Sequence, residues 1–384
     1  MKAALRKNRT ADTTSDLWGQ RMKVKLADVC ERGSSNLKQA DIAGKSGDYP
    51  VYGASGYIGN VDFYQQKKPY VAVVKDGAGI GRAMLLPAES SVIGTMQYLL
   101  PKSVVLPEYL FYVVKHMHLE KYFSGATIPH IYFRDYQNEE FTLDDLNKQH
   151  EVVTTLRKVE SVIENRQQQL EKMDELIKAR FVELFGVYPL NPKGWETATI
   201  RDIVTDVRYG SSRPAVDGGK YPYLRMNNIT YGGELDLTDT KRIDIPDNEL
   251  DKCTVRRGDV LFNRTNSKEL VGKTCVYNRD EMMVLAGFVI RVRVTERILP
   301  EFLSAFLNTD FSKRMLLGMC KAAIGQANIN AQEMQDIGIY LPPTELQRQF
   351  VQFKEQTDKS KAAIQKSLNE AQLLFDSLMQ QYFG

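Results

Sequence analysis

The side chains best suited to contact a nucleic acid gather in the second half of the chain. Residues 252–273 hold six basic residues against two acidic ones, although the whole chain carries a net charge of only +3. Within this segment a predicted strand, Val260–Phe262, leads into a loop of Asn, Arg, Thr and Ser. A local basic excess suits phosphate contact, while Arg and Asn side chains pair bidentately with guanine and adenine edges. We therefore expect a DNA-contacting surface that includes Asn263, Arg264, Thr265, Asn266 and Lys268.

Clusters of the same residue types lie elsewhere in both halves of the chain. In the second half, the further candidates for DNA contact are Arg208, Tyr209, Ser211, Arg213, Arg225, Asn227, Asn228, Gln326 and Asn328. In the first half, the candidates are Tyr52, Ser55, Tyr57, Lys75, Arg82 and His130. For any one of these residues the simpler interpretation is a polar loop in water, but the clusters taken together favour a nucleic-acid surface.

Two glycine-rich segments in the first half predict turns rather than a nucleotide site. The segment Lys75–Arg82 lies between two strand-like runs, Tyr70–Val74 and Met84–Leu86. A dinucleotide fingerprint needs a glycine where Arg82 stands and a helix after it, so a glycine-rich β-hairpin is the better interpretation. The segment Tyr52–Gly59 predicts a second turn that exposes small and aromatic residues.

Motifs that would indicate catalysis by this chain are missing from its sequence. It contains no Asn-Pro-Pro-Tyr/Phe or Asp-Pro-Pro-Tyr motif of an amino-methyltransferase and no Gly-x-x-x-x-Gly-Lys-Ser/Thr phosphate loop. The pair Pro246-Asp247 lacks the acidic-x-Lys partner of a nuclease metal site, and His116 and His118, in a predicted helix, have no third ligand nearby. We therefore expect no catalytic residue, no metal site and no cofactor in this chain.

The bulk composition is that of a globular protein inside the cell. Its 384 residues are 43% hydrophobic and 26% charged, and no stretch approaches the ~20 apolar residues of a membrane span. The four cysteines are scattered, which favours reduced thiols and a cytoplasmic location over disulfides or zinc. The N-terminus is basic without an apolar segment behind it, so a secretory signal is not expected.

The chain repeats itself, which indicates a tandem duplication. Phe185-Gly186 recurs as Phe383-Gly384, and each pair ends a long segment of helical periodicity. Each segment follows a short strand-like run, Phe141–Leu143 or Ile339–Leu341, and begins with a similar sequence, residues 146–149 or 346–349. The Pro-Glu-Tyr-Leu of residues 107–110 likewise matches the Pro-Glu-Phe-Leu of residues 300–303.

The two long segments predict helices of about 40 residues, or ~60 Å at 1.5 Å per residue. Apolar residues recur along the first at spacings typical of a coiled coil, at Leu156, Val159, Ile163, Leu170, Met173, Ile177 and Leu184. In the second they are Phe350, Phe353, Ile364, Ala371, Leu374 and Leu378. We expect the two helices to cover each other as an antiparallel pair, although packing on separate partners is an alternative.

These observations predict an α+β fold with two tandem globular α/β domains, each followed by a long helix, and with pseudo-two-fold symmetry. The expected parts are a flexible basic tail (1–20), a first globule (21–145), a central helix (146–186), a second globule (187–344) and a C-terminal helix (345–384).

Two further segments add to the duplicated order. Asn165–Leu170 reads Asn-Arg-Gln-Gln-Gln-Leu, and Ala323–Ile329 reads Ala-Ile-Gly-Gln-Ala-Asn-Ile. With them, the chain from about Arg21 onward resembles the specificity (HsdS) subunits of type I restriction–modification systems. The first half departs from this pattern, since Gly125–Ile131 has no Gln.

The resemblance implies a DNA-binding specificity subunit in which each globule is a target-recognition domain for one half of a split, asymmetric site. It implies that the helices set the gap between the half-sites and dock two modification subunits, which bind S-adenosylmethionine and methylate adenine N6. Two restriction subunits that use ATP and Mg²⁺ are possible further partners, and no membrane is implied. The alternative is a coiled-coil scaffold for protein contacts without sequence-specific readout of DNA.

Overall fold

The computed structural model describes residues 22–125, 129–320 and 327–384. The chain forms two compact units, which are described one at a time. Unit 1 comprises the described residues up to Gln167 together with Lys366–Gly384, and unit 2 comprises those from Gln168 to Gln365. Two 40-residue helices, α4 (Leu146–Phe185) and α9 (Thr344–Phe383), each contribute one part to unit 1 and the other part to unit 2.

Unit 1 is a mixed α/β globule built on a four-stranded antiparallel sheet in the order β2-β8-β5-β6. A second sheet has the order β4-β3-β7, and β1 pairs with β9. Its strands are β1 (Met22–Lys25), β2 (Cys30–Ser34), β3 (Tyr49–Gly53), β4 (Gly56–Val61), β5 (Tyr70–Val74), β6 (Ala83–Leu86), β7 (Ser91–Val92), β8 (Met96–Pro101) and β9 (Glu140–Leu143). Its short helices are α1 (Leu26–Val29), α2 (Pro107–His116) and α3 (Phe133–Tyr136).

Unit 2 has two four-stranded sheets, ordered β11-β19-β15-β17 and β13-β12-β18-β14, and two strand pairs, β10-β21 and β16-β20. Its strands are β10 (Glu196–Thr199), β11 (Val204–Tyr209), β12 (Tyr221–Leu224), β13 (Lys241–Ile243), β14 (Thr254–Val255), β15 (Val260–Asn263), β16 (Thr265–Asn266), β17 (Thr274–Val276), β18 (Met283–Leu285), β19 (Val289–Val294), β20 (Ala327–Asn328) and β21 (Gly338–Leu341). Its short helices are α5 (Asp247–Cys253), α6 (Pro300–Leu307), α7 (Asp310–Met319) and α8 (Ala331–Gln335).

The duplication is visible in how each long helix begins. In unit 1 the buried Gln149 accepts a hydrogen bond from the Leu106 amide (2.9 Å) and donates to two backbone carbonyls. In unit 2 the buried Gln347 does the same from the start of α9, accepting from the Leu299 amide at 2.8 Å. Gln149 therefore corresponds to Gln347, so the expected match of residues 146–149 to 346–349 is wrong by two residues.

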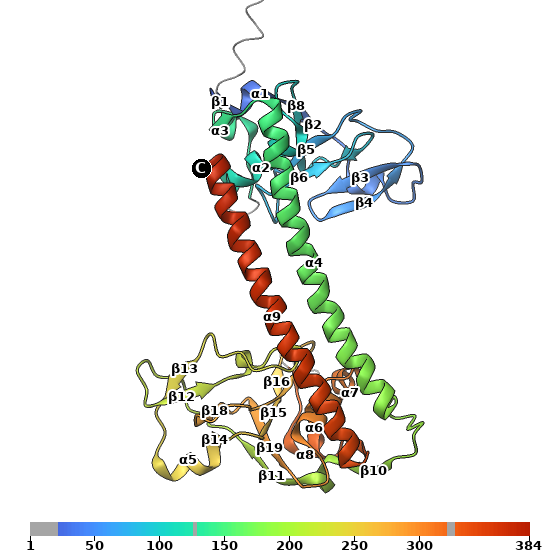
Figure 1. Cartoon of the computed structure of the whole chain (residues 1–384), viewed down its shortest axis with the longest axis vertical. Coiled ribbons are helices and arrows are strands. Elements are labelled where there is room, and N and C mark those ends of the chain that lie inside the picture. The colour runs from blue at the N-terminus through green and yellow to red at the C-terminus, as the bar shows by residue number, and fades with distance from the viewer. Residues whose placement is uncertain (1–21, 126–128, 321–326) are drawn as a thin grey trace, which may run out of the picture. The chain divides into compact units, whose positions relative to one another are not determined.

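The two long helices pack antiparallel, as predicted. In unit 1 the beginning of α4 (Val152, Leu156) shares a core with the end of α9 (Phe375, Met379). In unit 2 the end of α4 packs on the beginning of α9, where the rings of Phe181 and Phe350 lie 5.3 Å apart. Figure 1 shows the last turns of α9, in red, beside α2 in unit 1.

Most of the predicted apolar stripe lies on the packed side of the helices, with one correction. The stripe residues other than Leu374 are buried or half-buried. Leu374 is 51% exposed, while its neighbour Phe375 is 5% exposed and takes the expected place in the core. Leu374 and Phe375 both keep a 3–4 spacing from Ala371 and Leu378, but Phe375 lies on the side of the helix that Met379, four residues later, also buries in the core.

The expected strands and the expected hairpin are present, with a correction near His118. Tyr70–Val74 forms β5, fully buried, and Lys75–Arg82 is the turn of the β5–β6 hairpin. Gly81 has a φ of +83°, and a Cβ there would lie 2.4 Å from the Glu120 amide nitrogen, so only glycine fits. His116 ends α2, but His118 has a left-handed φ of 51° and lies outside the expected helix.

Candidate nucleic-acid interface

In unit 2, strand pairing brings together candidate residues that are far apart in the sequence. The buried strand β15 leads directly to Arg264 and then to β16, which pairs antiparallel with β20. Thr265 lies opposite Asn328, and its hydroxyl donates a hydrogen bond to the Asn328 side-chain oxygen at 2.9 Å. Asn266 lies opposite Ala327. One surface of unit 2 therefore carries residues from the segments around 265 and 328.

The Arg264 side chain lies at the centre of this surface. Its guanidinium carbon is 4.9 Å from the centre of the Tyr209 ring, a cation–π contact. The Tyr209 hydroxyl accepts a hydrogen bond from the Ala331 amide at 2.9 Å, which fixes the ring. Among the described residues, Arg264 forms no ion pair with a carboxylate, so its charge is available to a ligand. We call Tyr209, Arg264, Asn266 and Asn328 the Arg264 cluster.

Four candidates in unit 2 are buried, which corrects the expectation that they contact DNA directly. Asn263 is fully buried and donates to the carbonyls of Thr265 and Phe288. Asn228, 1% exposed, accepts from the Arg225 amide and donates to the carbonyls of residues 236 and 239. The other two are Ser211 and Thr265, 4% and 7% exposed. These side chains support loop conformation instead of facing a partner.

Three candidate arginines of unit 2 are held by carboxylates. Arg213 makes a bidentate pair with Glu249, at 2.7 and 3.2 Å. The partners of the other two are Asp206 for Arg208 and Asp239 for Arg225, each at 2.8 Å. Asn227 and Lys268 are exposed, and Gln326 lies outside the described residues. The structure thus gathers only part of the candidate set around Arg264.

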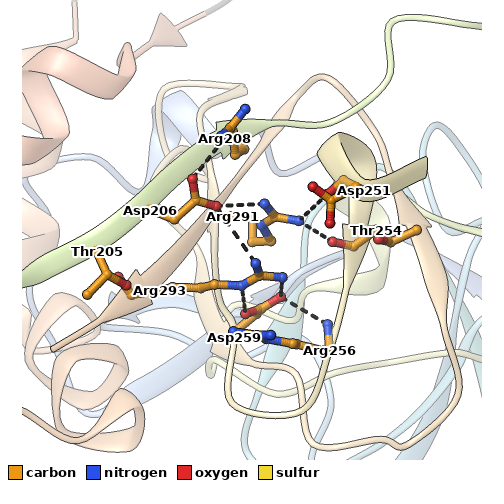
Figure 2. A network of polar contacts seen from close by, with 9 residues as sticks. All are labelled: Thr205, Asp206, Arg208, Asp251, Thr254, Arg256, Asp259, Arg291 and Arg293. Atoms are coloured by element: carbon orange, nitrogen blue, oxygen red, sulfur yellow. Dashed lines mark hydrogen bonds and ion pairs between the residues drawn. The ribbon is translucent and has the colours of Figure 1, made fainter. Parts of the chain in front are cut away.

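Unit 2 also contains a charged network that the sequence did not reveal (Figure 2). Arg291, 3% exposed, donates to the Asp206 carboxylate at 2.7 Å and also to the carbonyls of Asp251 and Thr254. Arg293 donates twice to the buried Asp259, at 2.8 and 3.3 Å. The network ties β11, which ends at Tyr209, to the centre of its sheet.

Charge pairing in this network shifts the pKa values of two of its members. Burial of the Asp206 carboxyl disfavours its charge, but hydrogen bonds from Arg208 and Arg291 outweigh burial and hold its pKa below the usual value. The hydrogen bond from Arg293 to Asp259 outweighs the burial of the guanidinium and raises the Arg293 pKa. In the sequence, Asp259 is only an acidic residue within a basic segment. Its function in the fold is visible only from its contacts in the structure.

In unit 1 the two glycine-rich turns meet. The Arg82 guanidinium, in the β5–β6 turn, donates a hydrogen bond to the carbonyl of Ala54, in the β3–β4 turn. The rings of Tyr52 and Tyr57 flank that turn in an edge-on contact, 6.2 Å apart, and Tyr57 is 61% exposed. Ser55 is exposed and Lys75 is half-buried. The turns that the sequence could only name separately thus form one polar and aromatic surface.

A second group of unit 1 centres on His130. A ring nitrogen of His130 lies 2.7 Å from the Asp76 carboxylate, in the β5–β6 turn, and the His130 ring stacks on Tyr132. The guanidinium carbon of Arg134 lies over the Tyr132 ring, 4.8 Å from its centre. Sequence reasoning named His130 but missed Asp76, Tyr132 and Arg134, because no motif marks them. The β5–β6 turn carries both Arg82 and Asp76, the partner of His130, so we name Tyr57, Arg82, His130, Tyr132 and Arg134, taken from both groups, the Arg82 cluster.

Within the part of the chain that the structure describes, no group of three or more His, Cys, Asp or Glu side chains could hold a metal ion. Among the described helices, none combines the length and the apolar character that crossing a membrane requires.

Comparison with known proteins gives two matches to one domain family along this chain. The family described as the type I restriction modification DNA specificity domain matches residues 20–173 and again residues 192–372.

Individual relatives carry related names. Over 182 residues the chain is 28% identical to the type I restriction enzyme EcoKI specificity subunit of Escherichia coli K12, which covers 46% of this chain and 39% of that protein. It is 26% identical to the putative MjaX specificity subunit of Methanocaldococcus jannaschii, over 50% of this chain and 46% of that protein. The aligned region thus spans less than half the length of these two relatives. The StySPI specificity subunit of Salmonella potsdam is 21% identical over 77% of this chain and 68% of its own length.

Solved structures share the fold. The crystal structure of the type I restriction–modification S subunit from M. genitalium superposes with a TM-score of 0.59 at 15% identity, covering 97% of this chain and 98% of that one. A chain from a study of complex assembly and conformational transition of the type I R-M system gives a TM-score of 0.55 at 17% identity, covering 94% and 97%. Because the two domain matches cover most of its length, this chain belongs to the family of type I restriction–modification DNA specificity subunits.

Proposed function

We propose that this chain reads an asymmetric, two-part DNA sequence, with one half-site for each specificity domain. The observation that carries the proposal is that the two domains present different polar surfaces. Unit 2 offers the Arg264 cluster, with one arginine, two asparagines and a tyrosine, whereas unit 1 offers the Arg82 cluster, with two arginines, two tyrosines and a histidine. Different side chains in the groove select different bases, so the two half-sites should differ.

Within each surface we assign different functions to different side chains. Arg264 has a free charge, and Asn266 and Asn328 flank it on the β16–β20 pair, which suits readout of base edges. Exposed basic residues such as Lys268 suit contact with phosphates, which supplies affinity without sequence information. The buried Asn263 and Thr265 then act by holding the loop that carries Arg264.

The long helices are the proposed docking elements for partner subunits. Some of their apolar side chains remain in water, among them Leu373 at 69% exposure in unit 1 and Leu176 at 48% in unit 2. Exposed apolar side chains on helices indicate contact with another protein when they form part of a larger patch. We propose two modification subunits as the partners, with two ATP-dependent restriction subunits, which also use Mg²⁺, joining them.

The chemistry in this proposal belongs to the partners and not to this chain. The modification subunits would bind S-adenosylmethionine and methylate adenine N6, after the base has left the duplex at a cost of a few kcal/mol. This chain would position them on its target in the cytoplasm without a cofactor of its own.

Selection from random DNA tests the proposed readout. The chain, purified with its modification subunits, is incubated with duplexes that carry a randomised region, and the retained DNA is sequenced. We expect a motif of two defined parts separated by a gap of fixed length. Recovery of no motif would reject sequence-specific readout and favour a scaffold that contacts only proteins.

A further inference from the structure

Unit 2 contains a cavity of about 550 Å³ that DNA readout does not use. It lies among the second part of α4, the first part of α9, the loop of residues 231–234 and the helices α6 and α7. Aromatic rings form much of its wall, including those of Tyr188, Tyr231, Phe306 and Tyr340. Small-molecule sites are typically apolar cavities of ~300–1,000 Å³ with a few polar groups, so the size and wall suit a ligand.

The first polar group of the cavity is an unusual lysine, Lys313 of α7. Its ammonium group donates to the Gly272 carbonyl at 3.2 Å and lies 5.2 Å from the centre of the Tyr231 ring. Burial, aided by the nearby Lys273, lowers the pKa of Lys313 to about 8. Within the described residues it forms no ion pair. Lys354 and Lys361 of the same wall, by contrast, pair with carboxylates.

The second feature is a pair of acceptors without a donor among the residues that the structure describes. The side-chain oxygen of Asn308 and one carboxylate oxygen of Asp358 are buried, and neither accepts a hydrogen bond from the described residues. Asn308 uses its amide group on the carbonyls of Thr274 and Ser304, at 2.6 and 2.9 Å, which fixes the orientation of its oxygen. Both residues line the cavity. Buried acceptors of this kind require a donor from a ligand or from water.

These features define the chemistry of an occupant. The aromatic wall favours a flat ring system. The acceptors of Asn308 and Asp358 need N–H groups, and the unpaired Lys313, with Arg314 beside it in the wall, needs an acidic group. We propose that the cavity binds a purine mononucleotide, with its base against the aromatic wall and its phosphate at Lys313.

Occupancy would affect how unit 2 is held together. A ligand in the cavity would touch both long helices and also α6 and α7. In Figure 1, α7 lies next to the end of α4. At the edge of the cavity Lys361 of α9 already links Asp174 of α4 to Glu234 of the 231–234 loop. A bound nucleotide would add to these links and stabilise the attachment of the second specificity domain to its helices.

Titration calorimetry of the full chain with AMP and GMP tests the proposal, with adenosine and inorganic phosphate as separate ligands. We expect a mononucleotide to bind, and adenosine and phosphate alone to bind at least tenfold more weakly. The affinity should fall as the pH rises through about 8, because Lys313 then loses its charge.

Three variants make the test specific. Lys313→Met should weaken nucleotide binding at least tenfold and abolish its pH dependence, while the loss of a buried charge should leave the fold intact. Val182→Trp, at an exposed position of the cavity wall, should block binding by filling the entrance. Lys359→Met, an exposed lysine of α9 outside the cavity wall, is the matched control and should bind as the wild type does.

Several results would overturn the proposal. One is failure of both nucleotides to bind at millimolar concentration, and another is equal binding by the wild type and Lys313→Met. A third is protection of Lys313 from reductive methylation by a modification subunit but not by a nucleotide, which would identify a protein segment as the occupant. Selection of a DNA motif is measured separately, so the proposed readout can hold even if the cavity proposal fails.

Discussion

A polar side chain in a loop can contact a partner or hold the loop, and its burial decides between these functions. Asn263 and Arg264 are neighbours with similar potential to contact DNA, yet Asn263 is fully buried and Arg264 is only half-buried, with its guanidinium over the Tyr209 ring. Asn263 is the last residue of β15, whose four residues are all buried, whereas Arg264 lies between β15 and β16. Arg264 is therefore the first residue to test for readout, whereas Asn266 already donates to the Asn263 side-chain oxygen at 3.1 Å and accepts from the Ser267 amide at 2.9 Å.

Replacing Arg264 or Asn266 with Ala should change only the half-site that the second domain reads. Loss of a bidentate base contact should cost about 1–3 kcal/mol of binding free energy on the correct sequence. Binding to duplexes with one altered half-site at a time measures this, and Arg82→Ala is the control for the other half-site. An equal loss of affinity on every duplex would show that these residues contact phosphates instead.

Asp259→Ala should strongly destabilise unit 2. Asp259 is 1% exposed and receives two hydrogen bonds from Arg293, and breaking such a buried pair costs about 3–5 kcal/mol. Urea unfolding gives the change in the free energy of unfolding. Asp280→Ala removes an exposed partner of Arg257 and should have little effect. A similar effect of both substitutions would contradict the importance of the network in Figure 2.

At the scale of elements, the two long helices depend on phase rather than on hydrophobicity alone. Leu374 and Phe375 are both large and apolar, but the helical period turns Phe375 toward α2 and leaves Leu374 in water. Each helix start is then fixed by a buried glutamine, Gln149 or Gln347, that bonds to the loop before α2 or α6. Each long helix is thereby joined to the globule that precedes it.

Phe375→Ala should destabilise unit 1 by about 3–5 kcal/mol, since a buried phenylalanine leaves a cavity. Its ring contacts Tyr112 and the Lys115 ammonium group. Leu374→Ala should change stability by less than about 0.5 kcal/mol, as at other exposed sites. Thermal or chemical unfolding of the two variants side by side measures the difference, and a larger loss for Leu374→Ala would contradict the observed phase.

Lengthening the helices should lengthen the unread gap of the DNA target. A seven-residue insertion between Leu146 and Gly186, matched in α9, keeps the apolar seam in phase. It adds ~10 Å at 1.5 Å per residue, or about three base pairs. Motif selection from random DNA measures the gap. Altered half-sites with an unchanged gap would reject the proposed function of the helices.

At the scale of the whole molecule, the chain is a tandem duplication whose two halves kept one fold and diverged in their polar surfaces. Both halves match the same domain family, and both place a strand pair, β1–β9 or β10–β21, before a long helix. The shared fold and the different surfaces together support a subunit that reads two dissimilar half-sites.

The purified chain alone should transfer no methyl group. Incubation with labelled S-adenosylmethionine and target DNA should label the DNA only after a modification subunit is added, because this chain lacks the methyltransferase motifs. Scintillation counting of the recovered DNA measures this. Repeated turnover by the chain without partners would show that it is an enzyme.

The sequence by itself determined the duplication, the two long helices with the strand before each, the glycine-rich hairpin at residues 75–82 and most of the apolar stripe. These features depend on periodicity and turn residues within a few positions of each other, which can be read directly from the chain. Only the tertiary structure decided that Arg82 meets Ala54, that Thr265 meets Asn328, that Asn228 and Asn263 are buried, and that a cavity forms beside Lys313. Burial and pairing arise between segments distant in the sequence, so local residue patterns do not contain them.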